Sequence, residues 1–241
     1  TVARQRAENT RVKGMLPEAL ELFARATQEF QAVNDAHGVM STLVDRGVVI
    51  RMLGRIEESS TFFAQCEELA RKIGDERALA AVLCNQGNVC IQLGQLERCE
   101  QLYIEAIAIF RRYDDQLGLS SAVGNLGNTY AVWQRWQQAL KCHEETLQRD
   151  QELGNKHSIA IHSDNISQVL AQLGNNEAAL SYARASEVAY RELGDVPSAI
   201  QTLSAQAQYL LNLKRWQEAK EKLMQMFQSP HRMRYAGSRQ E

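Results

Sequence analysis

The same turn signal returns every 40 residues along this chain. A second signal, also spaced by 40 residues, lies between the copies of the first. Self-similarity at a fixed period of this length is the signature of a repeat architecture, in which each copy buries its apolar face against its neighbours. Six copies account for residues 1 to about 227. The first signal stands at Lys13-Gly14, Leu53-Gly54, Leu93-Gly94, Gln134, Leu173-Gly174 and Leu213-Lys214, and the second at Asn34-Asp35, Gly74-Asp75, Asp114-Asp115, Gly154-Asn155 and Gly194-Asp195.

Each copy of the second signal predicts the end of one helix and the start of the next. Its first residue is Gly, Asn or Asp, which tolerate the left-handed backbone that closes a helix. Its second residue is Asp or Asn, which are preferred N-caps. Pro17 and Pro197 suit the first turn of a helix, and Pro230 suits the end of the last one. We therefore expect two antiparallel helices in each repeat, such as 79–93 and 96–112.

Small residues recur where paired helices have to approach closely. Twelve such positions, one in each predicted helix, are all filled by Gly, Ala, Ser or Cys. Large apolar residues fill the positions between them, which is the pattern of a packed core. The small residues are Ala7, Gly47, Gly87, Gly127, Ser167 and Ala207 in the first helices, and Ala19, Ser59, Cys99, Ala139, Ala179 and Ala219 in the second helices.

The run Asn125-Leu126-Gly127-Asn128-Thr129-Tyr130, followed by Trp136 and Ala139, resembles the consensus of the tetratricopeptide repeat (TPR). The resemblance covers residues 1 to about 227. It implies an all-α fold, a right-handed α-solenoid of about six antiparallel helix hairpins that forms a TPR superhelix. The 40-residue spacing is similar to that of spindle-orientation adaptors of the Pins/LGN type, and it also occurs in kinesin light chains and in sensor arms of bacterial regulators. We expect a single array with repeats at approximately 1–34, 35–74, 75–114, 115–154, 155–194 and 195–227, and a flexible C-terminal tail at 228–241.

The composition is that of an ordinary globular protein, with 44% hydrophobic and 23% charged residues. A net charge of -2 gives no sequence-wide attraction for nucleic acid or for an anionic membrane. The apolar stretch 78–84 is far shorter than the roughly 20 residues that a membrane helix needs. We therefore expect a cytoplasmic protein without membrane insertion. Because the chain begins with Thr1, we also expect it to be part of a longer protein.

The cysteines agree with an intracellular location. They are five in number and include no C-x-x-C pair, so we expect reduced residues in the core. Cys142 and His143 are adjacent, but neighbouring helix positions point about 100 degrees apart and no second ligand pair stands nearby. We expect no metal site and no cofactor. The five residues are Cys66, Cys84, Cys90, Cys99 and Cys142.

Charge separates the two helices of each repeat. The first helices of repeats three to six span 78–93, 118–133, 158–173 and 198–213, and together they contain one charged residue, Asp164. Their partner helices contain twenty-four. We interpret the charged helices as a solvated outer layer, since exposed ion pairs contribute little by themselves, and the uncharged helices as the inner layer.

The inner helices carry amides in place of charges. Spacings of three and seven residues put these amides on one face, and an amide offers both donors and acceptors to a peptide backbone. The TPR resemblance implies that the face lines a concave groove. The alternative is a structural role, because buried amides need hydrogen-bond partners of some kind. The amides assigned to the groove are Asn85, Asn88, Gln92, Asn125, Asn128, Asn165, Gln168 and Gln172.

The inner layer becomes basic toward the N-terminus. Six basic residues stand against two acidic ones, which leaves a local charge of 6 - 2 = +4. Arginine forks suit carboxylates, so we predict that Arg11, Asp45 and Arg51 belong to the groove and meet an acidic segment of the partner. The alternative is an edge repeat whose charges are only solvated. The full set is Arg4, Arg6, Arg11, Lys13, Arg46 and Arg51 against Glu8 and Asp45.

No catalytic motif stands in the context that it requires, so we do not expect an enzyme. We predict a protein–protein interaction scaffold, or adaptor, that binds an extended peptide segment of a partner in its concave groove. The neutral amide face and the small net charge disfavour nucleic acid as the partner. The alternative function is a ligand-sensing or autoinhibitory TPR arm of a larger signalling regulator.

Overall fold

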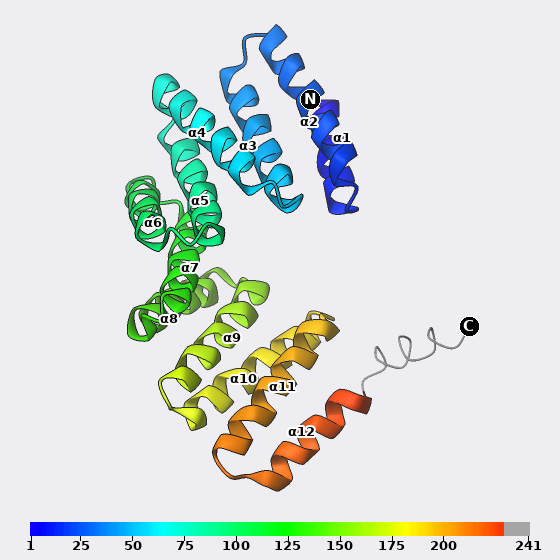
Figure 1. Cartoon of the computed structure of the whole chain (residues 1–241), viewed down its shortest axis with the longest axis vertical. Coiled ribbons are helices and arrows are strands. Elements are labelled where there is room, and N and C mark those ends of the chain that lie inside the picture. Colours follow the sequence, from blue (N-terminus) through cyan, green and yellow to red (C-terminus); the bar gives the residue numbers. More distant parts are fainter. Residues whose placement is uncertain (229–241) are drawn as a thin grey trace, which may run out of the picture. The chain divides into compact units, whose positions relative to one another are not determined.

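The computed structural model describes residues 1–228, so all of the predicted tail except Gln228 lies outside the described residues. The described chain forms twelve α-helices that follow one another with short turns (Figure 1). They are α1 Val2–Val12, α2 Leu16–Ala32, α3 Ala36–Met52, α4 Ile56–Ile73, α5 Glu76–Gln92, α6 Leu96–Arg112, α7 Gln116–Val132, α8 Trp136–Leu153, α9 Lys156–Gln172, α10 Asn176–Glu192, α11 Val196–Asn212 and α12 Trp216–Gln228.

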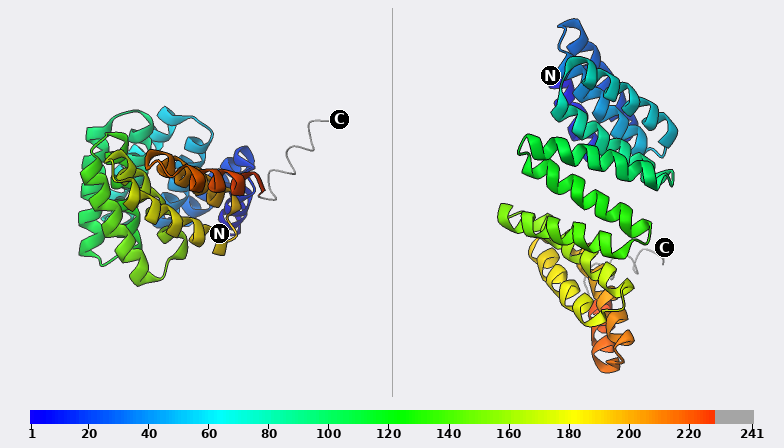
Figure 2. Two further views of the ribbon diagram at one scale, coloured as in Figure 1. Left: turned by 90° about the horizontal axis from the view of Figure 1, so that it is seen from below. Right: turned by 90° about the vertical axis from the view of Figure 1, so that its left-hand side faces the viewer.

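Helices that are consecutive in the sequence pack against each other within each part of the chain (Figures 1 and 2). Such neighbours include α1 and α2, α5 and α6, and α9 and α10. The prediction of an all-α array of about six helix hairpins is confirmed. None of the helices among residues 1–228 combines the length and the apolar character that crossing a membrane requires.

Both turn signals lie where the sequence predicts them. The first signal gives left-handed backbone at Gly14, Gly54, Gly94, Gln134, Gly174 and Lys214, and the second gives it at Asn34, Gly74, Asp114, Gly154 and Gly194. A residue with positive φ ends a helix by bonding its last carbonyl groups. The next residue then caps the following helix: the side chain of Asp75, for example, accepts the backbone N–H of Ala78 at 2.9 Å.

The small residues at the close-approach positions are all buried. A Cβ atom added to Gly87 would lie 2.6 Å from the ring of Tyr103, and one added to Gly47 would lie 2.8 Å from the ring of Phe63. The Oγ of Ser59 donates a hydrogen bond to the carbonyl oxygen of Gly47 at 2.8 Å. The predicted close approach of paired helices is therefore confirmed.

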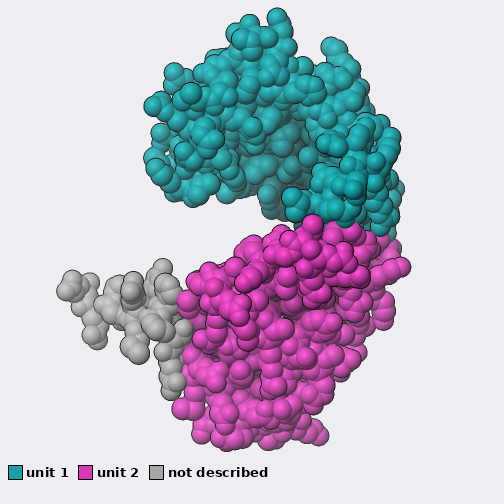
Figure 3. Space-filling model, turned by 180° about the vertical axis from the view of Figure 1, so that it is seen from behind, with its two compact units in different colours: residues 1–129 teal, residues 130–241 magenta. Residues whose placement is uncertain are grey.

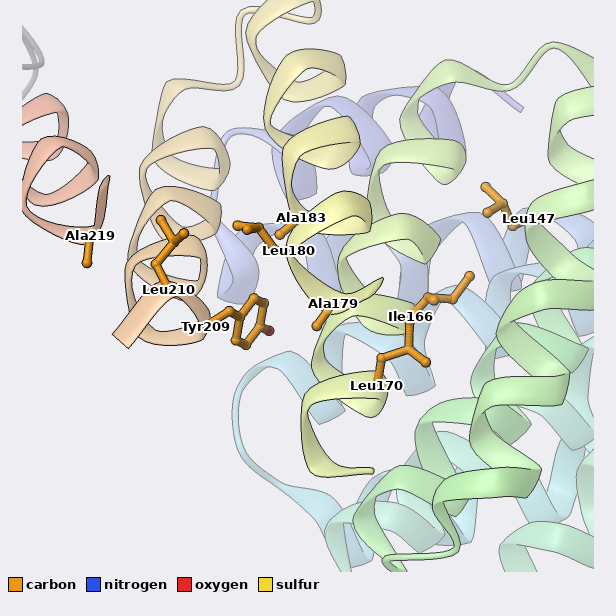
Figure 4. Packing of buried hydrophobic residues seen from close by; sticks show 9 residues of the cluster. All are labelled: Leu147, Ile166, Leu170, Ala179, Leu180, Ala183, Tyr209, Leu210 and Ala219. Atoms are coloured by element: carbon orange, nitrogen blue, oxygen red, sulfur yellow. The ribbon is translucent and has the colours of Figure 1, made fainter. Parts of the chain in front are cut away.

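The chain divides into two compact units, residues 1–129 and the residues from Tyr130 onward, and the boundary falls within α7 (Figure 3). Each unit has its own buried apolar clusters. In the first unit one cluster joins Phe63 and Cys66 of α4 with Val82 and Val89 of α5, and partly buried residues of α3 pack against it. In the second unit one cluster joins residues of α8 to α12, as Figure 4 shows: Leu147, Ile166, Leu170, Ala179, Leu180, Ala183, Tyr209, Leu210 and Ala219.

All five cysteines are free thiols, as expected. Cys66, Cys90 and Cys99 are buried, whereas Cys84 and Cys142 are half-buried. Burial raises the pKa of the Cys66 thiol and of the Cys84 thiol to about 12. These groups therefore stay protonated at neutral pH and lack the thiolate that a nucleophile or a metal ligand requires.

Candidate functional site

Three of the predicted amides meet in one hollow of the first unit. The hollow has a volume of about 330 Å³ and is lined by residues of α5 and α7 and by Phe110 near the end of α6. We call it the Asn hollow. Its lining consists of Ala81, Cys84, Asn85, Asn88, Phe110, Asp115, Gly118, Ser121 and Asn125.

Intramolecular hydrogen bonds orient two of these amides. The Nδ2 of Asn85 donates to the carbonyl oxygen of Ala81 at 2.9 Å, one turn earlier in α5. The Oδ1 of Asn88 accepts from the hydroxyl of Tyr103 at 2.7 Å. Asn85 is thus held through its N–H group and Asn88 through its oxygen. For Asn88 the structure supports the alternative interpretation of the amides, a structural role, since its hydrogen-bond partner is a buried tyrosine of α6.

A glycine opens the space beside α7. The Oδ1 of Asp115 accepts the backbone N–H of Gly118 at 2.8 Å, which caps the helix. A Cβ atom on residue 118 would lie 2.4 Å from Cε1 of Phe110 and 2.9 Å from Oδ2 of Asp115. Because Gly118 has no side chain, the aromatic ring and the second carboxylate oxygen border the same space.

A second hollow of the first unit lies where the basic site was predicted. We call it the Arg hollow; its volume is about 350 Å³. It repeats the Asn hollow 80 residues earlier in the sequence, since Gln5, Glu8 and Asp45 stand in the register of Asn85, Asn88 and Asn125. Its lining consists of Thr1, Arg4, Gln5, Glu8, Arg11 and Asp45.

The charges of the Arg hollow are paired within the chain. The Nε of Arg4 lies 2.9 Å from Oδ2 of Asp45, and the Nε of Arg11 lies 2.9 Å from Oε2 of Glu8. The hydrogen bond from Arg11 lowers the pKa of Glu8, and the same bond raises the pKa of Arg11. Burial raises the pKa of Asp45 in spite of its contact with Arg4. Much of the predicted positive charge is therefore balanced locally.

The other arginines of the basic set have different surroundings. The guanidinium carbon of Arg46 lies 4.8 Å above the ring centre of Phe62. Arg51 does not line the Arg hollow, and the buried Nε atoms of Arg46 and Arg51 have no hydrogen-bond partner. Burial lowers the pKa of Arg46. Arg11 and Asp45 thus share a hollow as predicted, but Arg51 lies apart from it.

The other five amides that the sequence assigned to the groove do not line either hollow. Gln92, Asn128 and Gln172 are exposed near the ends of α5, α7 and α9. In the second unit the Nε2 of Gln168 donates to Oδ2 of Asp164 at 2.8 Å, and Asn165 is half-buried on the same helix. The sequence grouped eight amides on one surface, whereas the structure places three of them together.

A buried polar cluster in the second unit was not predicted. His143 occupies the position that Phe23, Phe63 and Tyr103 hold in earlier repeats, and it is 1% exposed. Its Nδ1 lies 3.3 Å from Nδ1 of His162, whose Nε2 lies 3.7 Å from Oδ2 of the buried Asp150. Burial lowers the pKa of His143 to about 3 and also lowers the pKa of His162.

The 40-residue register contained the signal for this cluster, because histidine replaces an aromatic core residue there. Two histidines and one aspartate could suggest a metal ligand set. Among the described residues, however, no group of three or more His, Cys, Asp or Glu side chains has an arrangement that could hold a metal ion.

Comparison with known proteins identifies the repeats. Residues 78–152 and 125–192 match the family model for the tetratricopeptide repeat. Residues 78–192 are tetratricopeptide repeats. A search of curated protein sequences gives no significant match to this TPR chain.

Solved structures similar to this TPR chain have low sequence identity, so they show a shared fold. BtubC (BKLC) from P. vanneervenii has a TM-score of 0.79 at 12% identity, over 94% of this chain and 93% of that one. The STAND protein PH0952 from Pyrococcus horikoshii, which has a tetratricopeptide repeat sensor, has a TM-score of 0.82 at 14% identity; the match covers 95% of this chain and 36% of that one.

A putative kinesin light chain from Podosopora anserina is also similar, with a TM-score of 0.69 at 14% identity over 84% of this chain and 97% of that one. These structures do not single out the adaptors of the Pins/LGN type, whose repeat spacing is similar to the 40-residue spacing of this chain. The broad resemblance to TPR proteins is confirmed, and the narrower one is not supported.

Proposed function

We propose that this TPR chain is a protein-interaction module that binds an extended peptide segment of a partner protein and does not catalyse a reaction. The observation that carries this proposal is the meeting of Asn85, Asn88 and Asn125 in one hollow. A TPR array suggests protein partners, because repeat proteins generally use an extended inner surface for binding.

The two oriented amides offer complementary groups to a peptide backbone. Asn85 is held by its N–H group, which leaves its carbonyl oxygen to accept a hydrogen bond. Asn88 is held by its oxygen, which leaves its amino group to donate. They are three residues apart on α5 and so lie on one face of the helix. An extended ligand presents both N–H and C=O groups, and amides can pair with these whatever the ligand's side chains.

The Arg hollow extends the proposal to an acidic part of the same partner. Arg4 and Arg11 already hold Asp45 and Glu8, so a ligand carboxylate would exchange with or add to existing pairs. Such contacts set the rate and direction of encounter more than they add affinity. We expect the acidic part of the partner to bind to the first two repeats. An adaptor of the Pins/LGN type is one kind of protein in which such a segment could be bound.

A sensing arm of a larger regulator is the second candidate. The PH0952 structure contains a TPR sensor, and this chain spans about a third of that protein's length. In this case the segment bound by the inner helices would belong to the same polypeptide. A nucleotide-binding or catalytic domain beside the repeats in the full open reading frame would favour the sensing arm.

The proposal can be tested with a random peptide library displayed on phage and selected against the intact chain. Affinities of selected peptides are then measured by fluorescence polarisation for the wild type, the double variant Asn85→Ala with Asn125→Ala, and Gln101→Ala on the exposed face of α6. We expect the double variant to bind more weakly with unchanged helicity, since alanine favours helix, and Gln101→Ala to bind like the wild type. Equal affinities of all three proteins would contradict the proposal.

A further inference from the structure

We infer that the Asn hollow selects a ligand residue with a cationic side chain, a lysine or an arginine. This inference rests on the proposed peptide-binding function and names the side chain that the hollow accepts. It follows from the shape of the hollow, from the sign of its charge and from the hydrogen-bonding groups that border it.

The walls of the hollow match the two parts of such a side chain. Ala81, Gly118 and Phe110 contribute apolar groups to the lining. Asp115, Asn85 and Ser121, whose side chains carry oxygen atoms, line the same space. Lysine and arginine have an apolar stem and a charged end, and they cover apolar surface with the stem while the end stays hydrogen-bonded. A volume of about 330 Å³ is at the small end of the range for ligand pockets, about 300–1,000 Å³, which suits one long side chain.

The lining of the Asn hollow carries only negative charge. Asp115 is the only Asp, Glu, Lys or Arg among the lining residues. Its Oδ1 caps α7, and its Oδ2 borders the space that Gly118 leaves open. Two basic side chains of the third repeat have contacts elsewhere: Arg112 pairs with Glu76 at 3.0 Å, and the guanidinium carbon of Arg77 lies 5.1 Å above the ring centre of Tyr113. A ligand cation at Asp115 would therefore meet no competing cation in the lining.

The Arg hollow gives an internal comparison. Asp35, Gly38 and Phe30 repeat the arrangement of Asp115, Gly118 and Phe110, with the Oδ1 of Asp35 accepting the N–H of Gly38 at 2.9 Å. The hollow of that repeat pair, however, is lined by Arg4 and Arg11. The carboxylates of Glu8 and Asp45 in that hollow are already paired with these two arginines. We therefore expect a ligand cation to be selected only in the Asn hollow.

The test uses the Asp115→Asn variant, which removes the charge and keeps a capping side chain. Asparagine is as good an N-cap as aspartate, and Asn155 caps α9 in this protein by accepting the N–H of Ser158. The matched control is Asp35→Asn, the same change at the same place in an earlier repeat. Peptides from a random phage-displayed library are selected separately against the wild type and both variants, and the chosen residues are counted at each peptide position.

We expect the peptides selected by the wild type and by Asp35→Asn to share a position enriched in lysine or arginine, and we expect Asp115→Asn to lose that enrichment. Replacing the enriched lysine by norleucine should weaken binding to the wild type about ten-fold, the size of one charge-assisted hydrogen bond, and should change binding to Asp115→Asn little. Shifts of the side-chain amide signals of Asn85 and Asn125 in NMR spectra should accompany binding of the lysine peptide.

The outcomes separate this inference from the proposed function. Selected peptides that shift the amide signals of Asn85 and Asn125 but have no cationic position would overturn the inference and leave peptide binding intact. A cationic preference that survives in Asp115→Asn would also overturn it. If no peptide were enriched against the wild type, the proposed function itself would be wrong.

Discussion

Tyr103 links the packed interior to the Asn hollow. Its ring fits against Gly87, where any side chain would collide with it, and its hydroxyl holds Asn88 at 2.7 Å. The ring is fully buried, and burial raises the pKa of the phenol well above its usual range. It therefore remains a neutral hydrogen-bond donor. The tyrosine that packs against Gly87 thus also leaves the amino group of Asn88 as the one that the proposed ligand would meet.

Replacing Gly87 by leucine should destabilise the first unit. The first added carbon already lies 2.6 Å from the ring of Tyr103, and overpacking of this kind costs about 1–3 kcal/mol or more. The melting temperature should fall, and amide hydrogen exchange should become faster in α5 and α6. Ala108→Leu, at an exposed position of α6, is the control and should leave the melting temperature nearly unchanged. Equal effects of the two changes would mean that the packing register is wrong.

Removing the hydroxyl in Tyr103→Phe should cost about 1 kcal/mol of unfolding free energy, the net value of a typical hydrogen bond. Without that donor Asn88 is no longer fixed, so binding of a selected peptide should also weaken. Tyr182→Phe, at a half-buried position of α10, is the control for loss of a tyrosine hydroxyl. A Tyr103→Phe protein that matches the wild type in both urea unfolding and peptide affinity would show that this bond does not orient Asn88.

At the junction of α8 and α9, the residue types at core positions differ from those found 40 residues earlier in the chain. In α8 and α9 the core positions carry His143, Asp150 and His162, where the third repeat and its neighbour carry Tyr103, Phe110 and Ala122. Burial lowers the pKa of both histidines in the folded protein, because it disfavours the charged form. In the unfolded chain each takes up a proton near its ordinary pKa of about 6.5.

This junction should lose stability in acid. The folded pKa of His143, about 3, is below its unfolded value, so between these values the unfolded state binds more protons. Stability is therefore complete above about pH 6.5 and falls as the pH drops from there toward 3, by up to about 1.4 kcal/mol per pH unit for each histidine. His143→Phe, which restores the residue type of Phe23 and Phe63, should weaken this dependence.

The measurement is urea unfolding at pH 7.5 and pH 5 for the wild type, His143→Phe and His157→Phe. His157 is exposed in the first turn of α9, so its change controls for loss of one histidine without loss of a buried one. The stability difference between the two pH values should be smaller in His143→Phe than in the other two proteins. The same difference in all three would contradict the role of the buried histidine.

The helices and their turns could be predicted from sequence because the residues that end a helix are local signals. Gln134 and Lys214 adopt left-handed backbone although neither is a usual residue there, since the register places them at a required turn. The meeting of Asn85 and Asn125 could also be predicted, because their 40-residue offset puts them at equivalent places on successive inner helices.

Other features of the site depend on contacts that one sequence does not display. Asp115 has the pattern of an N-cap, and only the empty space at Gly118 reveals that its second oxygen borders a hollow. The sequence count set Glu8 against the whole basic group, whereas the structure pairs it with Arg11, one helical turn away. Arg51 was grouped with Arg11 by its register, but it is not among the residues that line the Arg hollow.

For the molecule as a whole, the two hollows and the histidine junction are divided between the two units. Both hollows lie in the first unit, and the polar junction lies in the second. A ligand that uses both hollows would meet paired arginines and carboxylates at one place and a single carboxylate among amides at the other. Its own charges, acidic for the first and basic for the second, would then set the direction in which it lies along the first unit.

Reversing the charge of Arg11 and Arg51 to glutamate should slow association with a selected peptide that carries an acidic segment. Arg11 holds Glu8, so the reversal replaces an ion pair with two like charges and makes the Arg hollow negative. Opposite charge mainly speeds encounter, so the association rate should fall more than the dissociation rate changes, and its dependence on salt should shrink. Stopped-flow mixing at low and moderate salt measures both the association rate and its dependence on salt.

The control reverses Arg98 and Lys141, which are exposed on α6 and α8, and should have little effect. Because Arg51 is half-buried, the single change Arg11→Glu is measured as well, with thermal melting to verify the fold. Suppose that the reversal at Arg11 and Arg51 and the control reversal slowed association equally. Only the total charge would then matter, and the proposal of an acidic contact at the Arg hollow would be wrong.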